Sequence, residues 1–215
     1  MAYALHHAAL LDLWRGDLTG VGARADALLA IAEAHDYGTW RALALVWGGM
    51  AMVGSGDVDP GLVRVEEGFE MYKGLSAPPV FWPALLMMRA SALGMAGRGA
   101  EGLVFIEEAE AALEPGDPMA PDVGIVHGEL LLVLTPPDAP AADAEFERAA
   151  ELAGGRGARM AQLQALTHLA VLRRETPGEA DALHSLQDAY DGFTEGFDTP
   201  HLVAARAALG GSAEV

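Results

Sequence analysis

The feature that most constrains the fold of this chain is a break in helix-forming sequence that returns about every forty residues. Turn-type residues occupy positions 15–17, 55–57, 96–98, 135–137 and 175–177, each between segments rich in Ala and Leu. The central residues Gly16, Gly56, Gly97, Pro136 and Thr176 are separated by 40, 41, 39 and 40 residues. Self-similarity at such a period is typical of repeat proteins, in which each unit is one supersecondary structure.

The segment after each break carries small or apolar residues at relative positions 0, 4, 7 and 11, which share one face of a helix. The five sets are Val21, Ala25, Leu28, Ala32; Gly61, Val65, Gly68, Tyr72; Gly102, Ile106, Ala109, Leu113; Ala142, Phe146, Ala149, Ala153; and Ala182, Leu186, Ala189, Phe193. Small residues let helices approach and larger ones fill the remaining space. The pattern predicts that this face packs against neighbouring helices.

The segment before each break is expected to be a partner helix. Small residues recur in register at Ala9, Gly49, Ala90 and Ala170. The fourth unit differs, because Leu130 is in register and Gly128 lies two residues earlier. We therefore expect shifted packing between the third and fourth units.

These patterns predict an all-α fold: a right-handed, tetratricopeptide-like α-solenoid of about five antiparallel helix pairs plus a terminal capping helix, forming a single domain over residues 1–215. Helices are expected near 2–15, 19–35, 39–54, 60–74, 80–96, 100–113, 120–134, 140–154, 157–174, 178–194 and 199–209. Asp59-Pro60 and Thr199-Pro200 are the clearest start signals, each a capping side chain before a proline. No strand alternation is evident.

Charge and composition exclude several classes of partner. The formal net charge is −18, from 31 acidic and 13 basic residues, and the basic residues form no patch. Phosphate backbones and anionic membranes are held by clusters of Lys and Arg, so we expect neither nucleic acid nor a membrane as partner. There is no cysteine, no signal-peptide pattern at the start, and no apolar run of the roughly 20 residues that span a bilayer. We expect a cytoplasmic protein.

Two stretches resemble a known class of protein. The spacing Ala142-x-x-x-Phe146-x-x-Ala149 resembles tetratricopeptide repeats, with longer units than usual. The sequences FTEGFDTPHL at 193–202 and HGELLL at 127–132 resemble the C-terminal repeat region of large bacterial signalling proteins. Those proteins join an adenylate or guanylate cyclase domain, or a DNA-binding domain in related regulators, to a predicted ATPase and then to this helical tail.

The resemblance implies a regulatory tail without a reaction of its own. Lys73 is the only lysine, and no G-x-x-x-x-G-K-[ST] loop is present to bind nucleotide phosphates. Because Met1 opens directly into helical sequence, we expect a tail that is detached from the catalytic domains.

No residue pattern indicates catalysis, a metal site or a cofactor, so we expect a protein that is not an enzyme. His6 and His7 are adjacent and point about 100° apart on a helix, which favours helical surface over chelation. The other histidines are dispersed, and Glu66-Glu67 and Glu107-Glu108 are expected on solvated faces. No serine stands in a G-x-S-x-G context.

The aromatic residues are the candidates for interaction. Core packing is expected for six of them, with ligand contact in a concave groove as the alternative: Trp14, Trp40, Trp47, Tyr72, Phe81 and Trp82. Phe193 and Phe197 are expected to anchor the last helix, with a docking site for another domain as the alternative. The predicted function is a non-catalytic scaffold for protein–protein or interdomain contacts. The alternative is a sensor whose groove binds a small molecule or peptide.

Overall fold

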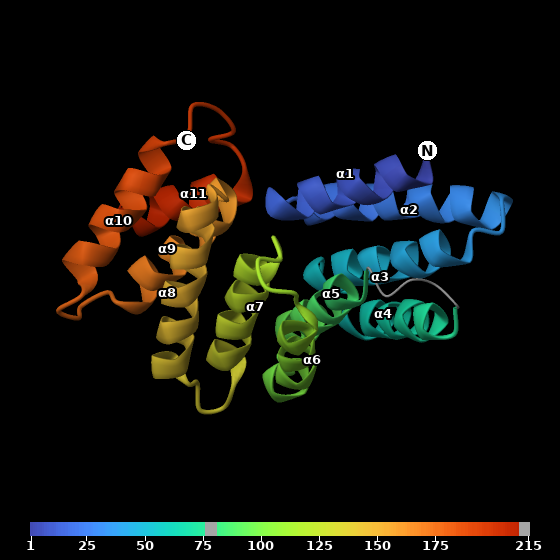
Figure 1. Cartoon of the computed structure of the whole chain (residues 1–215), viewed down its shortest axis with the longest axis horizontal. Coiled ribbons are helices and arrows are strands. Elements are labelled where there is room, and N and C mark those ends of the chain that lie inside the picture. The colour runs from blue at the N-terminus through green and yellow to red at the C-terminus, as the bar shows by residue number, and fades with distance from the viewer. Residues whose placement is uncertain (76–80, 211–215) are drawn as a thin grey trace.

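The computed structural model describes residues 1–75 and 81–210, and within these residues it is helical throughout, with no strand (Figure 1). The helices are α1 (Ala2–Trp14), α2 (Leu18–Ala34), α3 (Gly38–Gly54), α4 (Val58–Lys73), α5 (Trp82–Met95), α6 (Gly99–Ala112), α7 (Ala120–Val133), α8 (Ala139–Arg156), α9 (Arg159–Leu172), α10 (Glu179–Asp191) and α11 (Pro200–Ala208). Successive helices pair in an α-solenoid, as the repeat pattern predicted. Bounds differ from the prediction by at most three residues, and the predicted start at residue 80 lies outside the described residues.

The repeated columns form the packing faces of the second helix in each pair. All four predicted positions are buried in α2, α4 and α8. The first three positions are buried in α6 and the first two in α10, and Ala189 is partly buried. The last positions, Leu113 and Phe193, lie just beyond the ends of these helices and are partly buried. The 3.6-residue period therefore located the core of the array correctly, because only one stripe of each helix meets its neighbours.

Small residues set how closely the helices approach. A Cβ atom at Gly49 in α3 would lie 2.6 Å from the carbonyl oxygen of Gly61 in α4, so neither position has room for a side chain. In the fourth unit Gly128 plays this role instead, since a Cβ there would lie 2.5 Å from the ring of Phe146. Leu130 packs over Gly102 of the third unit. The shift of two residues predicted for the fourth unit is thus present.

Two predicted helix starts need correction. α4 begins at Val58 rather than at Pro60, so Asp57 precedes the helix and Pro60 lies within its first turn. Proline is tolerated there because the first backbone N–H groups of a helix have no partner within it. Thr199 does precede α11, but its hydroxyl donates to the carbonyl of Gly196 at 2.7 Å and does not cap the helix.

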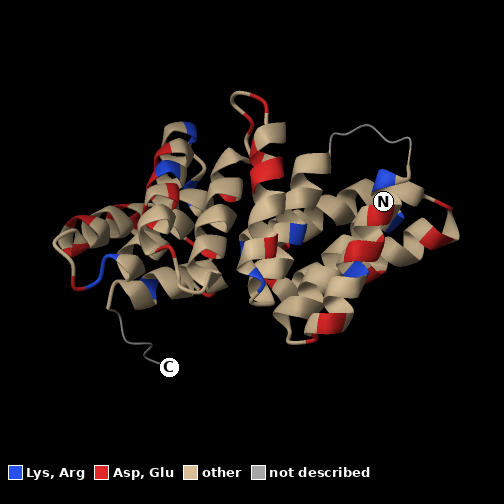
Figure 2. Ribbon diagram, turned by 90° about the horizontal axis from the view of Figure 1, so that it is seen from below, with Lys and Arg blue, Asp and Glu red and all other residues tan. Residues whose placement is uncertain are grey.

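The buried side chains form two large clusters and one small one. The first large cluster runs from α1 to α7 and the second from α7 to α11, and Leu103 packs against both. Charged residues lie outside these clusters, with Asp and Glu spread over many helices and fewer Lys and Arg among them (Figure 2). None of the helices in residues 1–75 and 81–210 is long and apolar enough to cross a bilayer.

Candidate functional site

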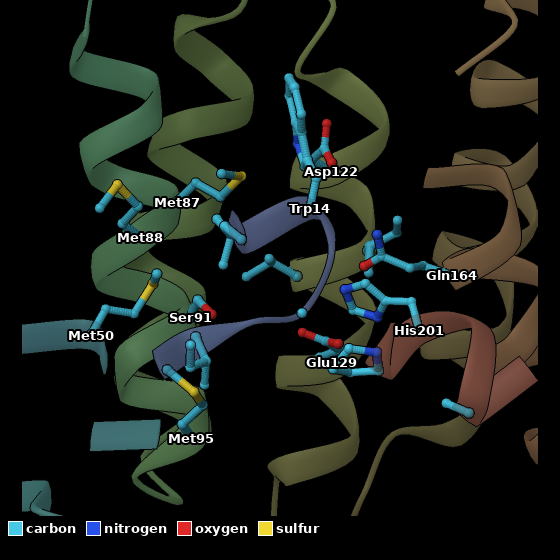
Figure 3. A pocket seen from close by; sticks show the side chains of 17 residues that line it. Trp14, Met50, Met87, Met88, Ser91, Met95, Asp122, Glu129, Gln164 and His201 are labelled. Carbon is cyan, nitrogen blue, oxygen red and sulfur yellow. The ribbon is translucent and has the colours of Figure 1, made fainter. Parts of the chain in front are cut away.

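A cavity of about 410 Å³ lies on the inner side of the solenoid (Figure 3). Its lining comes from α1, α3, α5, α7, α9 and α11, with two further residues from the turn after α1 and the start of α2. These are the first helices of each pair and the terminal helix. The volume is in the range of small-ligand sites in proteins. We call this space the inner cavity.

The two ends of the solenoid meet, because the turn after α1 lies beside the start of α11 (Figure 1). Gly16, in the turn between α1 and α2, has a φ of +76° and packs against the start of α11. A Cβ atom at Gly16 would lie 2.9 Å from Cβ of Pro200 and 3.1 Å from Nε2 of His201. Only glycine combines this backbone conformation with such a close approach. The turn therefore closes the end of the concave face against α11.

One side of the inner cavity is a methionine wall, which consists of Met50 from α3 and Met87, Met88 and Met95 from α5 (Figure 3). Methionine side chains are unbranched and polarisable, and they adapt their shape to different apolar partners. The wall therefore offers an apolar surface that does not demand one fixed ligand shape.

The opposite side is a polar wall formed by Asp122 and Glu129 of α7, Gln164 of α9 and His201 of α11 (Figure 3). Burial raises the pKa of Asp122 to about 6, although its own backbone N–H and the indole N–H of Trp14 both donate to the carboxylate. Because desolvation outweighs these two hydrogen bonds, the ionised carboxylate is poorly compensated.

The two histidines near Glu129 differ in their setting. Burial lowers the pKa of His201, which the carbonyl of Leu13 and the charge of Glu129 offset only in part. His201 is therefore neutral near pH 7. Nε2 of His168, in α9, lies 3.1 Å from the Glu129 carboxylate. The residues that line the inner cavity thus include two carboxylates, Asp122 and Glu129, and neither lysine nor arginine.

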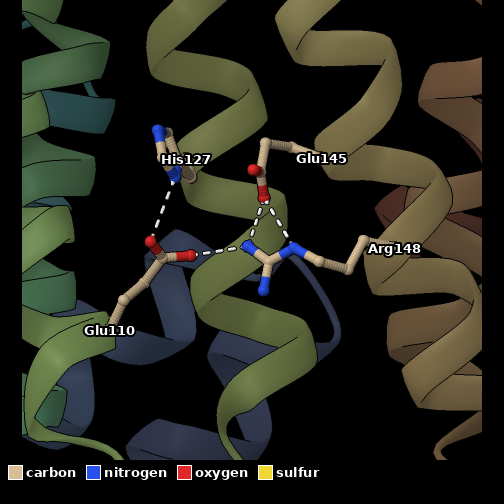
Figure 4. Close-up of polar contacts among 4 residues, drawn as sticks. All are labelled: Glu110, His127, Glu145 and Arg148. Carbon is tan, nitrogen blue, oxygen red and sulfur yellow. Dashed lines mark hydrogen bonds and ion pairs between the residues drawn. The ribbon is translucent and has the colours of Figure 1, made fainter.

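A second polar cluster joins α6, α7 and α8 (Figure 4). Glu110, His127 and Glu145 place potential metal-ligating atoms within 4.8 Å of one another. The guanidinium of Arg148 lies between the two carboxylates, with Nη2 2.6 Å from Glu110 and Nε 3.1 Å from Glu145. His127 Nδ1 lies 3.4 Å from the other oxygen of Glu110, and this contact raises the pKa of His127. The Arg148 guanidinium thus bridges the two carboxylates, and the cluster is explained as an ion-pair network.

The structure places the predicted interaction residue Trp47 in the core, where it is 1% exposed and its Nε1 donates to Nδ1 of His6 at 3.1 Å. His6 is 5% exposed, so its predicted position on the helix surface was wrong. The indole N–H needs a buried acceptor, and the ring of His6 also contacts Trp40 and Phe81. Burial, and secondarily the charge of His7, lowers the pKa of His6 to about 4.

The other predicted interaction residues lie away from the inner cavity. Trp40 and Trp82 are partly buried against the first large cluster, and the indole of Trp82 donates to Glu108 at 3.2 Å. Phe193 is partly buried against the second cluster, whereas Phe197 is 40% exposed. These four and Trp47 are absent from the lining of the inner cavity, whereas Trp14, a further candidate for groove contact, is part of it.

Sequence reasoning did not single out Asp122, Glu129, His201 or the methionines as site residues. They lie on four helices that come together only through the curvature of the array. The available signals were weak: Met87, Met88 and Met95 recur at helical spacing, and His201 lies in the stretch at 193–202. Either signal is also expected of core packing.

No family model matches this chain, and no curated protein does. The chain is similar to a solved structure, the crystal structure of Bacillus thuringiensis PlcR in complex with the peptide PapR7 and DNA. The two superpose with a TM-score of 0.74 over 97% of this chain and 73% of that chain, at 13% sequence identity. At this identity the likeness concerns the fold, and it agrees with the α-solenoid described above.

Proposed function

We propose that this chain is a non-catalytic regulatory scaffold that binds a short peptide segment of a protein partner in the inner cavity. The observation that carries the proposal is the cavity itself, with its methionine wall facing a polar wall (Figure 3). Such a site accepts apolar side chains on one side and orients the peptide through hydrogen bonds on the other. The peptide in the PlcR structure supports this choice of ligand class.

The proposed partner is a protein rather than a nucleic acid or a membrane, and the proposed setting is the cytoplasm. Support comes from the net charge of −18 and from the scattered Lys and Arg, which give a phosphate backbone or an anionic lipid surface no positive patch (Figure 2). The DNA in the PlcR structure is a ligand of PlcR, and we do not propose it as a ligand of this chain.

The test of peptide binding is selection of random heptapeptides against the full chain, followed by measurement of the recovered peptides with two variants. Ala204→Trp places a large side chain at an exposed position that lines the inner cavity. Ala207→Trp makes the same change at an exposed position of α11 that does not line it. We expect the first variant to lose binding and the second to keep it. Recovery of no peptides, or binding that survives Ala204→Trp, would contradict the proposal.

The regulatory setting we propose is a signalling system of the cyclase or ATPase type. The resemblance of residues 193–202 and 127–132 supports it, and exposure of the Phe197 side chain leaves a docking contact available there. Affinity capture from the source cells, with a Phe193→Ala/Phe197→Ala variant as control, is the test. Capture of a cyclase, an ATPase or a related regulator by the original chain and not by the folded variant is the expected result. Capture of none of these would contradict the signalling assignment. It would not affect peptide binding, which the heptapeptide selection tests.

A further inference from the structure

Asp122 is a partly buried carboxylate that faces the inner cavity and forms no ion pair with any of the described residues, in contrast to Asp143 and Glu110. Asp143 is held by two nitrogens of Arg173, at 2.8 and 2.7 Å, and Glu110 by Arg148 at 2.6 Å. Within the described part of the chain, Asp122 accepts from the Trp14 indole and from its own backbone N–H. Because buried charges in proteins are normally paired, an unpaired carboxylate facing a cavity indicates a missing partner.

The groups that face Asp122 across the cavity do not supply that partner. His201 is held neutral by burial, and Gln164 carries no charge. Glu129 adds a second carboxylate to the same wall, 3.1 Å from His168. Among the residues that line the inner cavity there is neither Lys nor Arg. A ligand that enters this space therefore meets two carboxylates and no fixed positive charge.

The opposite wall restricts the ligand further. The four methionines offer apolar contact across the cavity from the carboxylates (Figure 3). A free metal cation would leave this wall unused. Lysine and arginine side chains combine an apolar stem with a charged end, and a neighbouring apolar residue extends the contact. The cavity volume of about 410 Å³ limits the occupant to a short segment.

We infer that the inner cavity binds a peptide segment that presents a cationic group to Asp122 and Glu129 and an apolar side chain to the methionine wall. The inference rests on the proposed function and specifies the chemistry of its ligand. The cationic group is the guanidinium of arginine or the ammonium of lysine. Pairing it with Asp122 replaces water around both charges by a charge-assisted hydrogen bond, which is about twice as strong as a neutral one.

The test compares heptapeptide selection on the original chain with selection on two double variants. Asp122→Asn/Glu129→Gln removes the carboxylates of the polar wall and keeps their shape. Glu151→Gln/Glu195→Gln changes the net charge equally at exposed residues outside the inner cavity. The original chain and the surface variant are expected to recover peptides with one basic residue beside an apolar one. The cavity variant is expected to recover apolar peptides without the basic preference.

A second measurement uses the original chain alone and so does not depend on any variant folding. Each recovered peptide is compared with a copy in which citrulline, a neutral analogue of similar shape, replaces arginine. We expect the citrulline copy to bind about tenfold more weakly or worse. Equal binding of the two copies, or an unchanged basic preference in the cavity variant, would refute the cationic ligand while peptide binding stands. Failure to recover any peptide would refute peptide binding itself.

Discussion

Replacement of Asp122 by Asn is expected to stabilise the ligand-free protein, although it removes a residue of the proposed site. Burial raises the pKa of Asp122 from 3.8 to about 6. The folded state therefore holds a proton on this carboxyl over a pH range in which the unfolded state has released it. Stability falls as the pH rises through this window, and at 1.36 kcal/mol per pKa unit the loss is at most about 3 kcal/mol.

Asn cannot ionise, and its side-chain oxygen still accepts from the Trp14 indole. At pH 7 we thus expect the Asp122→Asn variant to be more stable than the original chain by up to about 3 kcal/mol. For a chain of 215 residues this corresponds to a rise in melting temperature of several degrees. The difference should shrink as the pH is lowered and be small near pH 4, which is close to the unfolded-state pKa of 3.8.

The assay is thermal and urea unfolding of both proteins at several pH values between 4 and 7.5. The neighbouring groups Glu129, Gln164 and His201 are the same in both proteins, so the difference between the two curves isolates Asp122. A variant that is less stable at pH 7, or one whose gain is independent of pH, would refute the argument that this carboxylate is an uncompensated charge. Gain of stability together with loss of peptide binding is the pattern expected of a binding residue.

Three further substitutions test the packing and the other charged groups. Asp143→Asn should lower the free energy of unfolding by about 1–2 kcal/mol in urea at pH 7, because it weakens the paired hydrogen bonds to Arg173, and an unchanged value would show that this ion pair contributes nothing. Gly49→Ala should destabilise by about 2 kcal/mol or more, since its Cβ would lie 2.6 Å from a carbonyl oxygen of α4; a rise in melting temperature would mean that the helices separate at little cost. Burial lowers the pKa of His6 to about 4, so stability should be lost as the pH falls from about 6.5 towards 4, by up to about 3 kcal/mol. His6→Gln, which keeps an acceptor for Trp47, should reduce that acid sensitivity in melting experiments at pH 7 and pH 4, and equal sensitivity would exclude His6 as its source.

The helix pairs were accessible from sequence because their signals are local and are repeated. Each break lies within a few residues of a turn, and each apolar column lies on one helix face, so five units reinforce the same interpretation. Even the irregular fourth unit was visible, in the displacement of Gly128 from the register set by the other units. Helix starts were less well predicted. Asp57 and Asp59 are both suitable residues to precede a helix, and α4 begins after Asp57, two residues before the predicted start at Pro60.

The inner cavity was not accessible in this way. Most of the residues that line it come from odd-numbered helices that belong to different repeats. The Glu110–His127–Arg148 contacts likewise join three helices. His6 shows the same limitation within one unit. Because His7 follows it in the sequence, His6 was expected on an exposed helix surface. In the structure the rings of Trp40, Trp47 and Phe81 surround His6 and bury it.

The sequence alone determined that the chain is an α-solenoid, where its helices lie and which face of each is buried, because these follow from a period that every unit repeats. The tertiary structure decided what the solenoid encloses. The small rotation between successive pairs accumulates along the array, and it brings the turn at Gly16 against Pro200 and His201. That closure, which no local pattern encodes, places the methionines of α3 and α5 across from the carboxylates of α7.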